Sequence, residues 1–204
     1  MNITSTQNPL IKKIALLSEK SRERKKQGLC VVEGAREIRL ALQGGYSLEN
    51  LLYQPDIFSE RQLNELLGYT TQKLTPIAIS KEVYEKISYR SSTEGVIALV
   101  QVKKHDLDTL SFKNKMPLLL VAEAPEKPGN IGALLRTADA AHIDAVIIAN
   151  PKTDLYNPTI IRSSVGCVFT VPLATGTTAE VIDFLKAKNI SSFCAALTAS
   201  KPYY

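Results

Sequence analysis

The stretch "EKPGNIGALLRTADAAHIDAVIIAN", residues 126–150, decides the fold of this chain. It begins with a turn that contains Pro128 and Gly129, continues with apolar residues at helical spacing and ends in a short β-rich run. The run "PLLLVAEA" before it lacks polar alternation, which is typical of a strand buried in a parallel sheet. Strand, helix and strand in this order predict a parallel α/β unit.

The loop that leads into this helix is a candidate ligand site, because open α/β sheets bind ligands where a strand passes into a helix. The glycine fingerprint of dinucleotide-binding folds and the P-loop are both absent from it. Gly129 and Gly132 allow the backbone to approach a ligand or a neighbouring segment closely. We expect Asn130 to cap the helix. An ordinary capped helix start, without a ligand, is the alternative.

Arg136 interrupts the helix six residues after Asn130, roughly 9 Å along the axis at about 1.5 Å per residue. Because Leu134, Leu135 and Ala138 are expected to face the sheet, the arginine lies at the boundary of the buried face. A planar guanidinium at this position suits phosphate recognition. The alternative is a surface ion pair with an aspartate of the same stretch (Asp139, Asp144).

Downstream of this stretch the same alternation continues. Asn157 and Pro158 predict the start of a short helix, and "CVFTVPLA" (167–174) predicts a strand. Thr177 and Glu180 have the spacing of a capping box. "SSFCAALTA" (191–199) predicts a last strand, for which the sequence supplies no covering helix.

Upstream, residues 8–28 predict one amphipathic helix that ends at Gly28. Strands alternate with helices over residues 29–102, which predicts a separate α/β domain. Residues 103–116 are polar and predict a linker. The fold class is therefore α/β with two domains, residues 1–102 and 117–204.

The net charge of +5 lies entirely in residues 1–26. These hold seven Lys and Arg residues and two Glu, and the other 178 residues hold 18 of each sign. A localised basic segment is typical of a protein that binds a polyanion. We expect Arg22, Arg24, Lys25 and Lys26 to contact nucleic-acid phosphates; a solvated helix face is the alternative.

The three cysteines are scattered and form no Cys-x-x-Cys pair, which argues against a disulfide framework and against a metal site. They favour a reducing cytoplasm. No apolar run is long enough to cross a bilayer, and the first residues lack the apolar core of a signal peptide.

"EKPGNIGALLRTADAA" and "YNPTIIRSSVGCVFTVP" together resemble the SpoU (TrmH-like) branch of the RNA ribose methyltransferases. These are enzymes of the SPOUT class, which have a trefoil-knotted α/β domain. Residues 3–42 resemble the family's substrate-binding domain, whose fold is similar to small kink-turn-binding ribosomal proteins. The resemblance implies 2′-O-methylation of rRNA or tRNA with S-adenosylmethionine as cofactor, and a homodimer for the complete protein.

The resemblance also implies roles for single residues. Arg136 and Asn130 fall on the family's first motif, whose arginine is taken as catalytic, and Glu126 lies in its opening turn. Arg162 and Ser164 fall between this motif and the knot, where we expect RNA contacts. Arg36, after "VVEG", is a further RNA-binding candidate, with an ordinary surface charge as the alternative. His142 stands where the family usually has glycine, and we interpret it as a left-handed helix end.

The family's Gly-x-Glu-x-x-Gly and Ser-Leu-Asn motifs, which form the knot and most of the cofactor pocket, do not occur in this sequence. We therefore expect an incomplete second domain without tight cofactor binding, and self-association through apolar surface near residues 190–199. The resemblance favours an enzyme. The missing motifs favour a non-catalytic RNA-binding module. A Rossmann-like nucleotide-dependent enzyme is a third possibility, which the missing phosphate motifs argue against.

Overall fold

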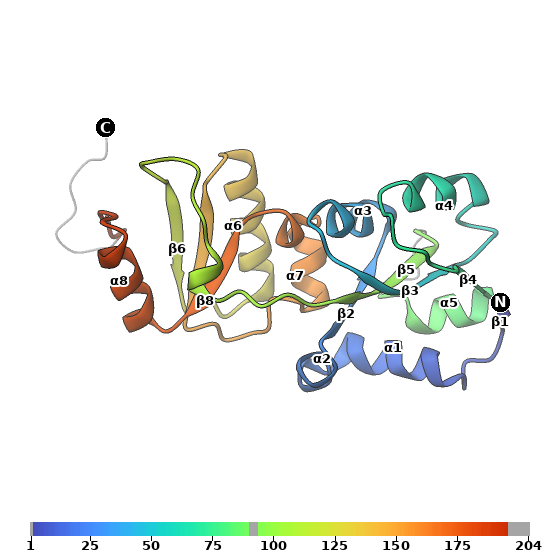
Figure 1. Cartoon of the computed structure of the whole chain (residues 1–204). Helices are drawn as coiled ribbons and strands as arrows, with labels where there is room; N and C mark the ends of the chain where they lie inside the picture. Colours follow the sequence, from blue (N-terminus) through green and yellow to red (C-terminus); the bar gives the residue numbers. More distant parts are fainter. Residues whose placement is uncertain (1, 90–93, 196–204) are drawn as a thin grey trace.

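The computed structural model of the chain describes residues 2–89 and 94–195. Two sheets lie side by side with helices on both faces of each, as the prediction of an α/β fold requires (Figure 1). The sheet of the first half is mixed, and the sheet of the second half is parallel. The fold class predicted from the sequence is therefore confirmed.

The first sheet has five strands in the order β1-β4-β3-β5-β2. Parallel pairs join β4 to β1 and β3, whereas β5 runs antiparallel to β3 and β2. The strands are β1 (Asn2–Ile3), β2 (Leu29–Glu33), β3 (Leu48–Tyr53), β4 (Ile77–Ile79) and β5 (Val96–Gln101).

Helices cover both faces of this sheet. One face packs against α1 (Pro9–Glu19) and α5 (Lys81–Ile87), through Ile11, Ile14 and Leu17 among others. The opposite face packs against α3 (Ala35–Gln43) and α4 (Glu60–Leu67). Because alternate residues of β2 point to opposite faces, Val31 joins the first core and Val32 the second.

The basic segment folds into two helices, whereas the sequence predicted one. After α1 the chain is extended at Lys20, with φ −105° and ψ 108°, and α2 (Ser21–Gln27) then begins. Gly28 ends α2 in the left-handed conformation, as predicted. The break turns the axis of α2 away from that of α1 (Figure 1).

The second sheet has three parallel strands in the order β6 (Leu119–Glu123), β7 (Ala145–Ala149) and β8 (Leu173–Gly176). On one face lie α6 (Pro128–Ala140) and α7 (Pro158–Ser163), and on the other lies α8 (Thr178–Ala187) (Figure 1). β7 is buried along its whole length, but β6 is half-buried or exposed. The burial predicted for β6 is therefore wrong, because among the described residues it pairs with β7 alone.

Two other strand predictions fail in part. Residues 167–169 of the predicted strand form a 3-10 turn, because Gly166 before them has a left-handed φ of 87°, and extended structure begins at Leu173. Residues 191–195 of the predicted last strand form no strand and are exposed. Its remaining residues, 196–199, lie outside the described part of the chain.

The predicted helix caps are largely confirmed. The predicted capping box of Thr177 and Glu180 is complete. Ser59 and Gln62 form a second complete capping box, and the Ser80 side chain accepts from the Val83 amide. Asn157 caps α7, with Pro158 in its first turn. His142 has φ 51°, which confirms the left-handed helix end after α6.

The two sheets share a core and a polar cluster. One continuous set of buried side chains contains Val32 and Val96 from the first sheet together with Val146 and Ile148 from the second. At its border the Tyr156 hydroxyl hydrogen-bonds Tyr46, at 3.1 Å, and the Nε2 of His105, at 2.8 Å. This polar cluster of Tyr46, His105 and Tyr156 ties together both halves of the chain and the segment between them.

Candidate functional site

Arg136 lies on the exposed side of α6, in the third turn after the loop that leaves β6. Its Nη1 donates a hydrogen bond to the main-chain carbonyl of Ser163 in α7. It takes part in none of the ion pairs found among the described residues, so the alternative of a surface ion pair is not supported. The guanidinium is held at one corner and its remaining N–H groups stay accessible to a ligand.

The close packing of α6 on α7 creates this arrangement. Ile131, Gly132 and Leu135 are buried in α6. A Cβ at Gly132 would lie 2.0 Å from the Ser163 Oγ and 2.7 Å from the Ser164 amide nitrogen, both far closer than real contacts. Glycine therefore allows the contact that brings Arg136 to the Ser163 carbonyl. Gly129, in contrast, has open space around it.

Asn130 is not the N-cap of α6, contrary to the prediction. The helix begins at Pro128, two residues before Asn130, with Lys127 as the capping residue. The proline ring fixes φ at a helical value, so the helix starts at this residue. Asn130 is the third helical residue and is exposed on the same helix as Arg136. Glu126 is also exposed, in the loop before the helix.

Two residues predicted to contact RNA, Arg24 and Ser164, are buried in the structure, so this prediction is wrong for both. Arg24 is 3% exposed and forms an ion pair with Asp154, so its charge is neutralised inside the protein. Ser164 is fully buried, and its hydroxyl donates to the carbonyl of Ile161. Neither side chain can reach a phosphate without unfolding of its surroundings.

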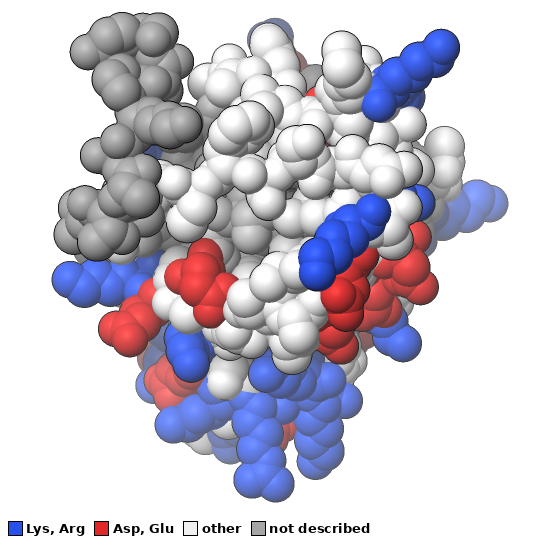
Figure 2. Space-filling model, turned by 90° about the vertical axis from the view of Figure 1, so that its left-hand side faces the viewer, with Lys and Arg blue, Asp and Glu red and all other residues white. Residues whose placement is uncertain are grey.

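The remaining basic residues of α2 form one exposed face. Arg22, Lys25 and Lys26 are exposed, and Lys20 before them is exposed as well. In Figure 2 blue side chains gather at the lower end of the molecule, the level at which α2 lies in Figure 1. We call Lys20, Arg22, Lys25 and Lys26 the α2 basic face.

Arg36 and Arg162 come from different halves of the chain and line one pocket of about 270 Å³. Arg36 pairs with Glu37, with 2.7 Å between Nη2 and Oε1. The Arg162 guanidinium lies over the Tyr89 ring, 5.6 Å from its centroid. Burial raises the pKa of Glu33, which accepts a hydrogen bond from the Tyr89 amide at 2.7 Å. We call this the interdomain pocket.

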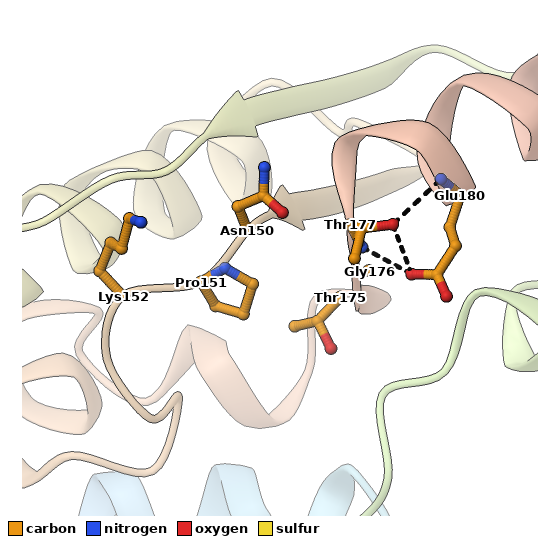
Figure 3. Close-up of a pocket in the computed structure, with 7 residues that line it drawn as sticks. All are labelled: Asn150, Pro151, Lys152, Thr175, Gly176, Thr177 and Glu180. Atoms are coloured by element: carbon orange, nitrogen blue, oxygen red, sulfur yellow. Dashed lines mark hydrogen bonds between the residues drawn. The ribbon is translucent and has the colours of Figure 1, made fainter.

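A second hollow, of about 490 Å³, lies at the carboxyl ends of β7 and β8 (Figure 3). Three of its polar side chains, those of Asn150, Thr177 and Glu180, already form hydrogen bonds within the protein. Glu180 accepts from the Thr177 amide at 2.7 Å and from the Thr177 hydroxyl at 2.9 Å. The Asn150 amide donates to Glu123 and Thr178. The Glu123 carboxyl accepts from the Thr178 hydroxyl and from Asn150, and these two bonds lower its pKa. Of the charged side chains that line this hollow, Glu180 is thus engaged within the protein, whereas Lys152 takes part in none of the ion pairs found among the described residues.

Within the described ranges, 2–89 and 94–195, no three His, Cys, Asp or Glu side chains gather closely enough to hold a metal ion. In the same part of the chain no helix is both long and apolar enough for a membrane span.

Sequence reasoning missed the partners of the predicted residues. Asp154 lies two residues before the quoted "YNPTIIRSSVGCVFTVP" segment but carried no signal that it would bind Arg24. Tyr89 and Glu33 could have been found only by recognising that Arg162 and "VVEG" meet in space. Both contacts, Arg24 with Asp154 and Arg162 with the "VVEG" segment, depend on how the two halves of the chain pack.

Two family models match this chain, the MRM3-like substrate binding domain over residues 8–98 and the SpoU rRNA Methylase family over residues 117–204. A crystal structure described as an RNA 2′-O ribose methyltransferase is 38% identical, with a TM-score of 0.76, over 93% of this chain and 70% of that one. The chain belongs to the SpoU family. The first motif of this SpoU chain, with Asn130 and Arg136, lies inside the second matched range.

Two relatives are named as methyltransferases of 23S ribosomal RNA. The 23S rRNA (uridine(2479)-2′-O)-methyltransferase of Streptomyces viridochromogenes is 30% identical over 85% of this chain. The 23S rRNA (guanosine(2553)-2′-O)-methyltransferase RlmP of Bacillus subtilis is 26% identical over 79% of it. The SpoU chain spans 60% and 64% of the lengths of these two proteins.

A crystal structure of the SpoU methyltransferase AviRb from Streptomyces viridochromogenes, in complex with the cofactor AdoMet, is 28% identical to the SpoU chain. Its TM-score is 0.78, over 90% of this chain and 69% of that one. The cofactor that the resemblance implies is therefore present in a solved relative.

The described residues of this SpoU chain do not fit S-adenosylmethionine. A cofactor of this size needs an apolar slot for its adenine and free polar groups for its ribose and amino-acid ends. The hollow beside β7 and β8 is open, and its Thr177, Glu180 and Asn150 side chains are already paired (Figure 3). The chemistry that can be derived for this chain therefore concerns the RNA.

Proposed function

We propose that the protein takes part in 2′-O-methylation of ribosomal RNA, and that these residues bind the RNA and supply the catalytic arginine. The observation that carries the proposal is the position of Arg136, anchored to the Ser163 carbonyl and exposed toward solvent in the family's first motif. A buried or ion-paired arginine could not contact a substrate. Asn130, exposed on the same helix, is a second candidate contact.

Arg136 acts as a positioned cation in this mechanism. A ribose hydroxyl is a poor nucleophile and loses its proton as the methyl group arrives. A guanidinium stays protonated in proteins, so it cannot accept that proton. Arg136 instead donates N–H groups to the substrate phosphate and stabilises the negative charge that develops on the 2′-oxygen. Anchoring to Ser163 fixes the guanidinium before the substrate arrives and so reduces the entropic cost of orienting it.

The α2 basic face supplies the non-specific part of RNA binding in this proposal. Phosphate contacts from Lys and Arg dominate nucleic-acid affinity and position the substrate. The face belongs to residues 1–102, which we propose as the RNA-binding domain, with residues 103–116 as linker and 117–204 as methyltransferase domain. A cytoplasmic location and a homodimer, both expected from the sequence, stay predictions.

The proposal is tested with the native protein, 23S rRNA and S-adenosylmethionine that carries a tritiated methyl group. We expect tritium in the RNA as 2′-O-methylated nucleotides, and loss of the label with Arg136→Ala while RNA affinity is kept. Label in the Arg136→Ala reaction at the rate of the unchanged protein contradicts the role of Arg136.

The alternative is a non-catalytic RNA-binding module. The paired side chains of the hollow beside β7 and β8 favour it, because they leave no evident place for the methyl donor. RNA binding without any label in the unchanged protein supports this alternative. Isothermal titration of the native protein with S-adenosylmethionine separates the two independently of RNA: binding favours the enzyme, and no binding favours the RNA-binding module.

A further inference from the structure

The interdomain pocket has the make-up of a ligand site. It lies between β2 and α3 of the first half and α7 of the second. Val31, Ile87 and Ile161 give it apolar walls, and charged side chains stand among them. Its volume of about 270 Å³ falls just below the roughly 300–1,000 Å³ of pockets for drug-sized molecules. A single planar ring system fits this size better than a whole cofactor.

Tyr89 and Arg162 supply a surface on which a flat ring can stack. The Arg162 guanidinium lies over the ring, and the Tyr89 hydroxyl is 3.2 Å from the hydroxyl of Thr159 in α7. The Tyr89 amide is held by Glu33 at 2.7 Å. Tyr89 is therefore fixed from both halves of the chain although 56% of its surface is exposed. Unstacked RNA bases bind on aromatic rings and guanidinium planes of this kind.

Carboxylates supply the hydrogen-bond acceptors of the interdomain pocket. Glu33, Glu37 and Glu94 line it together with the two arginines. Glu37 is buried, and its Oε1 pairs with Arg36. Glu33 and Glu37 already accept from the Tyr89 amide and from Arg36, but a carboxylate has about four lone-pair sites and can accept a further bond. A base that offers an amino group can donate to it, as cytosine does from its exocyclic N4. Uracil has a carbonyl oxygen at that position, which a carboxylate repels.

We propose that the interdomain pocket binds one unstacked RNA nucleobase that carries an exocyclic amino group. The inference rests on the proposed function, because it takes RNA as the ligand. The base stacks on an outer face of the Tyr89–Arg162 pair and donates to the carboxylates, while Arg36 lies within reach of its phosphate.

The position of the pocket relative to Arg136 fits this proposal. Arg162 lines the pocket, and the next residue of α7, Ser163, accepts the hydrogen bond from Arg136. Successive residues of a helix point about 100° apart, so α7 separates the pocket from the guanidinium of Arg136. A base held in the pocket thus fixes the RNA strand beside the arginine, and the pocket acts as a specificity site for a nucleotide near the modified one.

The test is a heteronuclear NMR titration of the chain with CMP and with UMP, two nucleotides of equal size that differ at the exocyclic position. We expect CMP to shift the amide signals of Tyr89, Arg162 and Glu37 and to bind roughly tenfold more tightly than UMP. Equal binding of both nucleotides, or CMP shifts confined to other parts of the chain, overturns the proposal.

Variants of Tyr89 test the stacking. Tyr89→Ala should weaken CMP binding about tenfold, because base–aromatic stacking is lost. Tyr89→Phe keeps the ring and removes only the hydroxyl, so we expect binding within about twofold of the unchanged chain. Circular dichroism checks that both variants fold. If Tyr89→Ala folds and binds CMP normally, the stacking role is wrong.

The outcomes also separate this inference from the proposed function. A chain that binds a fragment of 23S rRNA but shows no preference between CMP and UMP refutes the pocket and leaves the RNA-binding function standing. A chain that binds neither the rRNA fragment nor CMP refutes both.

Discussion

Arg24 and Asp154, 130 residues apart in sequence, form a buried ion pair that joins α2 to the loop after β7. The Nε and Nη2 of Arg24 lie 2.8 and 2.5 Å from the same carboxylate oxygen, Oδ2. The Nη1 of Arg24 also donates to the carbonyl of Leu17, at 2.6 Å. One of the seven charges of the basic segment thus connects the two halves of the protein.

Arg24→Ala should lower the free energy of unfolding by about 3–5 kcal/mol, because it leaves the Asp154 carboxylate buried without its cation. Urea unfolding followed by circular dichroism measures the change. Lys25→Ala, one residue later and exposed, is the matched control and should change stability by less than about 0.5 kcal/mol. Equal stability of the two variants contradicts a structural role for Arg24.

Replacing Arg22, Lys25 and Lys26 together by alanine should weaken RNA binding and flatten its salt dependence. Each lost phosphate contact reduces the slope of log K against log salt by roughly 0.7–0.9. Filter binding between 50 and 250 mM KCl measures the slope. A variant with Lys113, Lys115 and Lys186 replaced by alanine loses the same charge elsewhere on the protein. It should keep most of the salt dependence of the unchanged chain. Equal slopes in both variants would mean that the α2 basic face is only a solvated surface.

Gly132→Ala should destabilise the protein by roughly 1–3 kcal/mol, because the new methyl group forces α6 away from α7. Gly129→Ala, in the same helix but with open space around it, should be neutral or slightly stabilising. Thermal unfolding of the two variants gives the comparison. We also expect Gly132→Ala to lower activity, since it displaces the Ser163 carbonyl that holds Arg136.

Arg136→Ala should lower kcat for methyl transfer by about 100-fold or more, the usual effect of removing a donor that stabilises developing oxyanion charge. Arg136→Lys should restore little, because an ammonium lacks the planar fork of donors. Single-turnover assays of the native protein with 23S rRNA measure the rate. Arg61→Ala, an exposed arginine on α4, serves as control. A lysine variant at the normal rate refutes the role of the guanidinium.

Folding stability should fall as the pH drops from about 7 to 5, because burial lowers the pKa of His105 below its value of 6.5 in the unfolded chain. Nδ1 faces the carbonyl of Leu173 and so carries the proton, and Nε2 accepts from the Tyr156 hydroxyl. A second proton would turn this acceptor into a donor. The melting temperature at pH 7.5 and 5.5 measures the loss, and His105→Gln should reduce the difference between them.

Local signals in the sequence predicted local structure well. The capping boxes at Ser59 and Thr177 depend on residues three positions apart, so the sequence contains both partners. The left-handed helix ends at Gly28 and His142 likewise depend on residues that are adjacent in sequence. The start of α6 was misplaced because Pro128 and Asn130 both favour a helix start, and the proline prevails.

Features that depend on distant partners could not be predicted. The basic residues of α2 look alike in sequence, and only the position of Asp154 makes Arg24 structural and Lys25 free. Arg36 and Arg162 were candidates for RNA contacts, but their meeting with Tyr89 in one pocket follows from the packing of the two halves. The resemblance gave the role of Arg136, and the structure adds the Ser163 carbonyl as its anchor.

The continuous core across the two sheets has a consequence for protein engineering. A chimera that takes its first half from a relative must match the surface formed by Val146, Ile148 and the ring of Tyr156 as well as the joining peptide. Tyr46 and His105 both hydrogen-bond Tyr156. Recombination between SpoU proteins at residues 103–116 should therefore give a stable protein mainly when these three residues come from the same parent. The residues that determine substrate preference are then transferred between relatives only together with the residues that pack the two halves against each other.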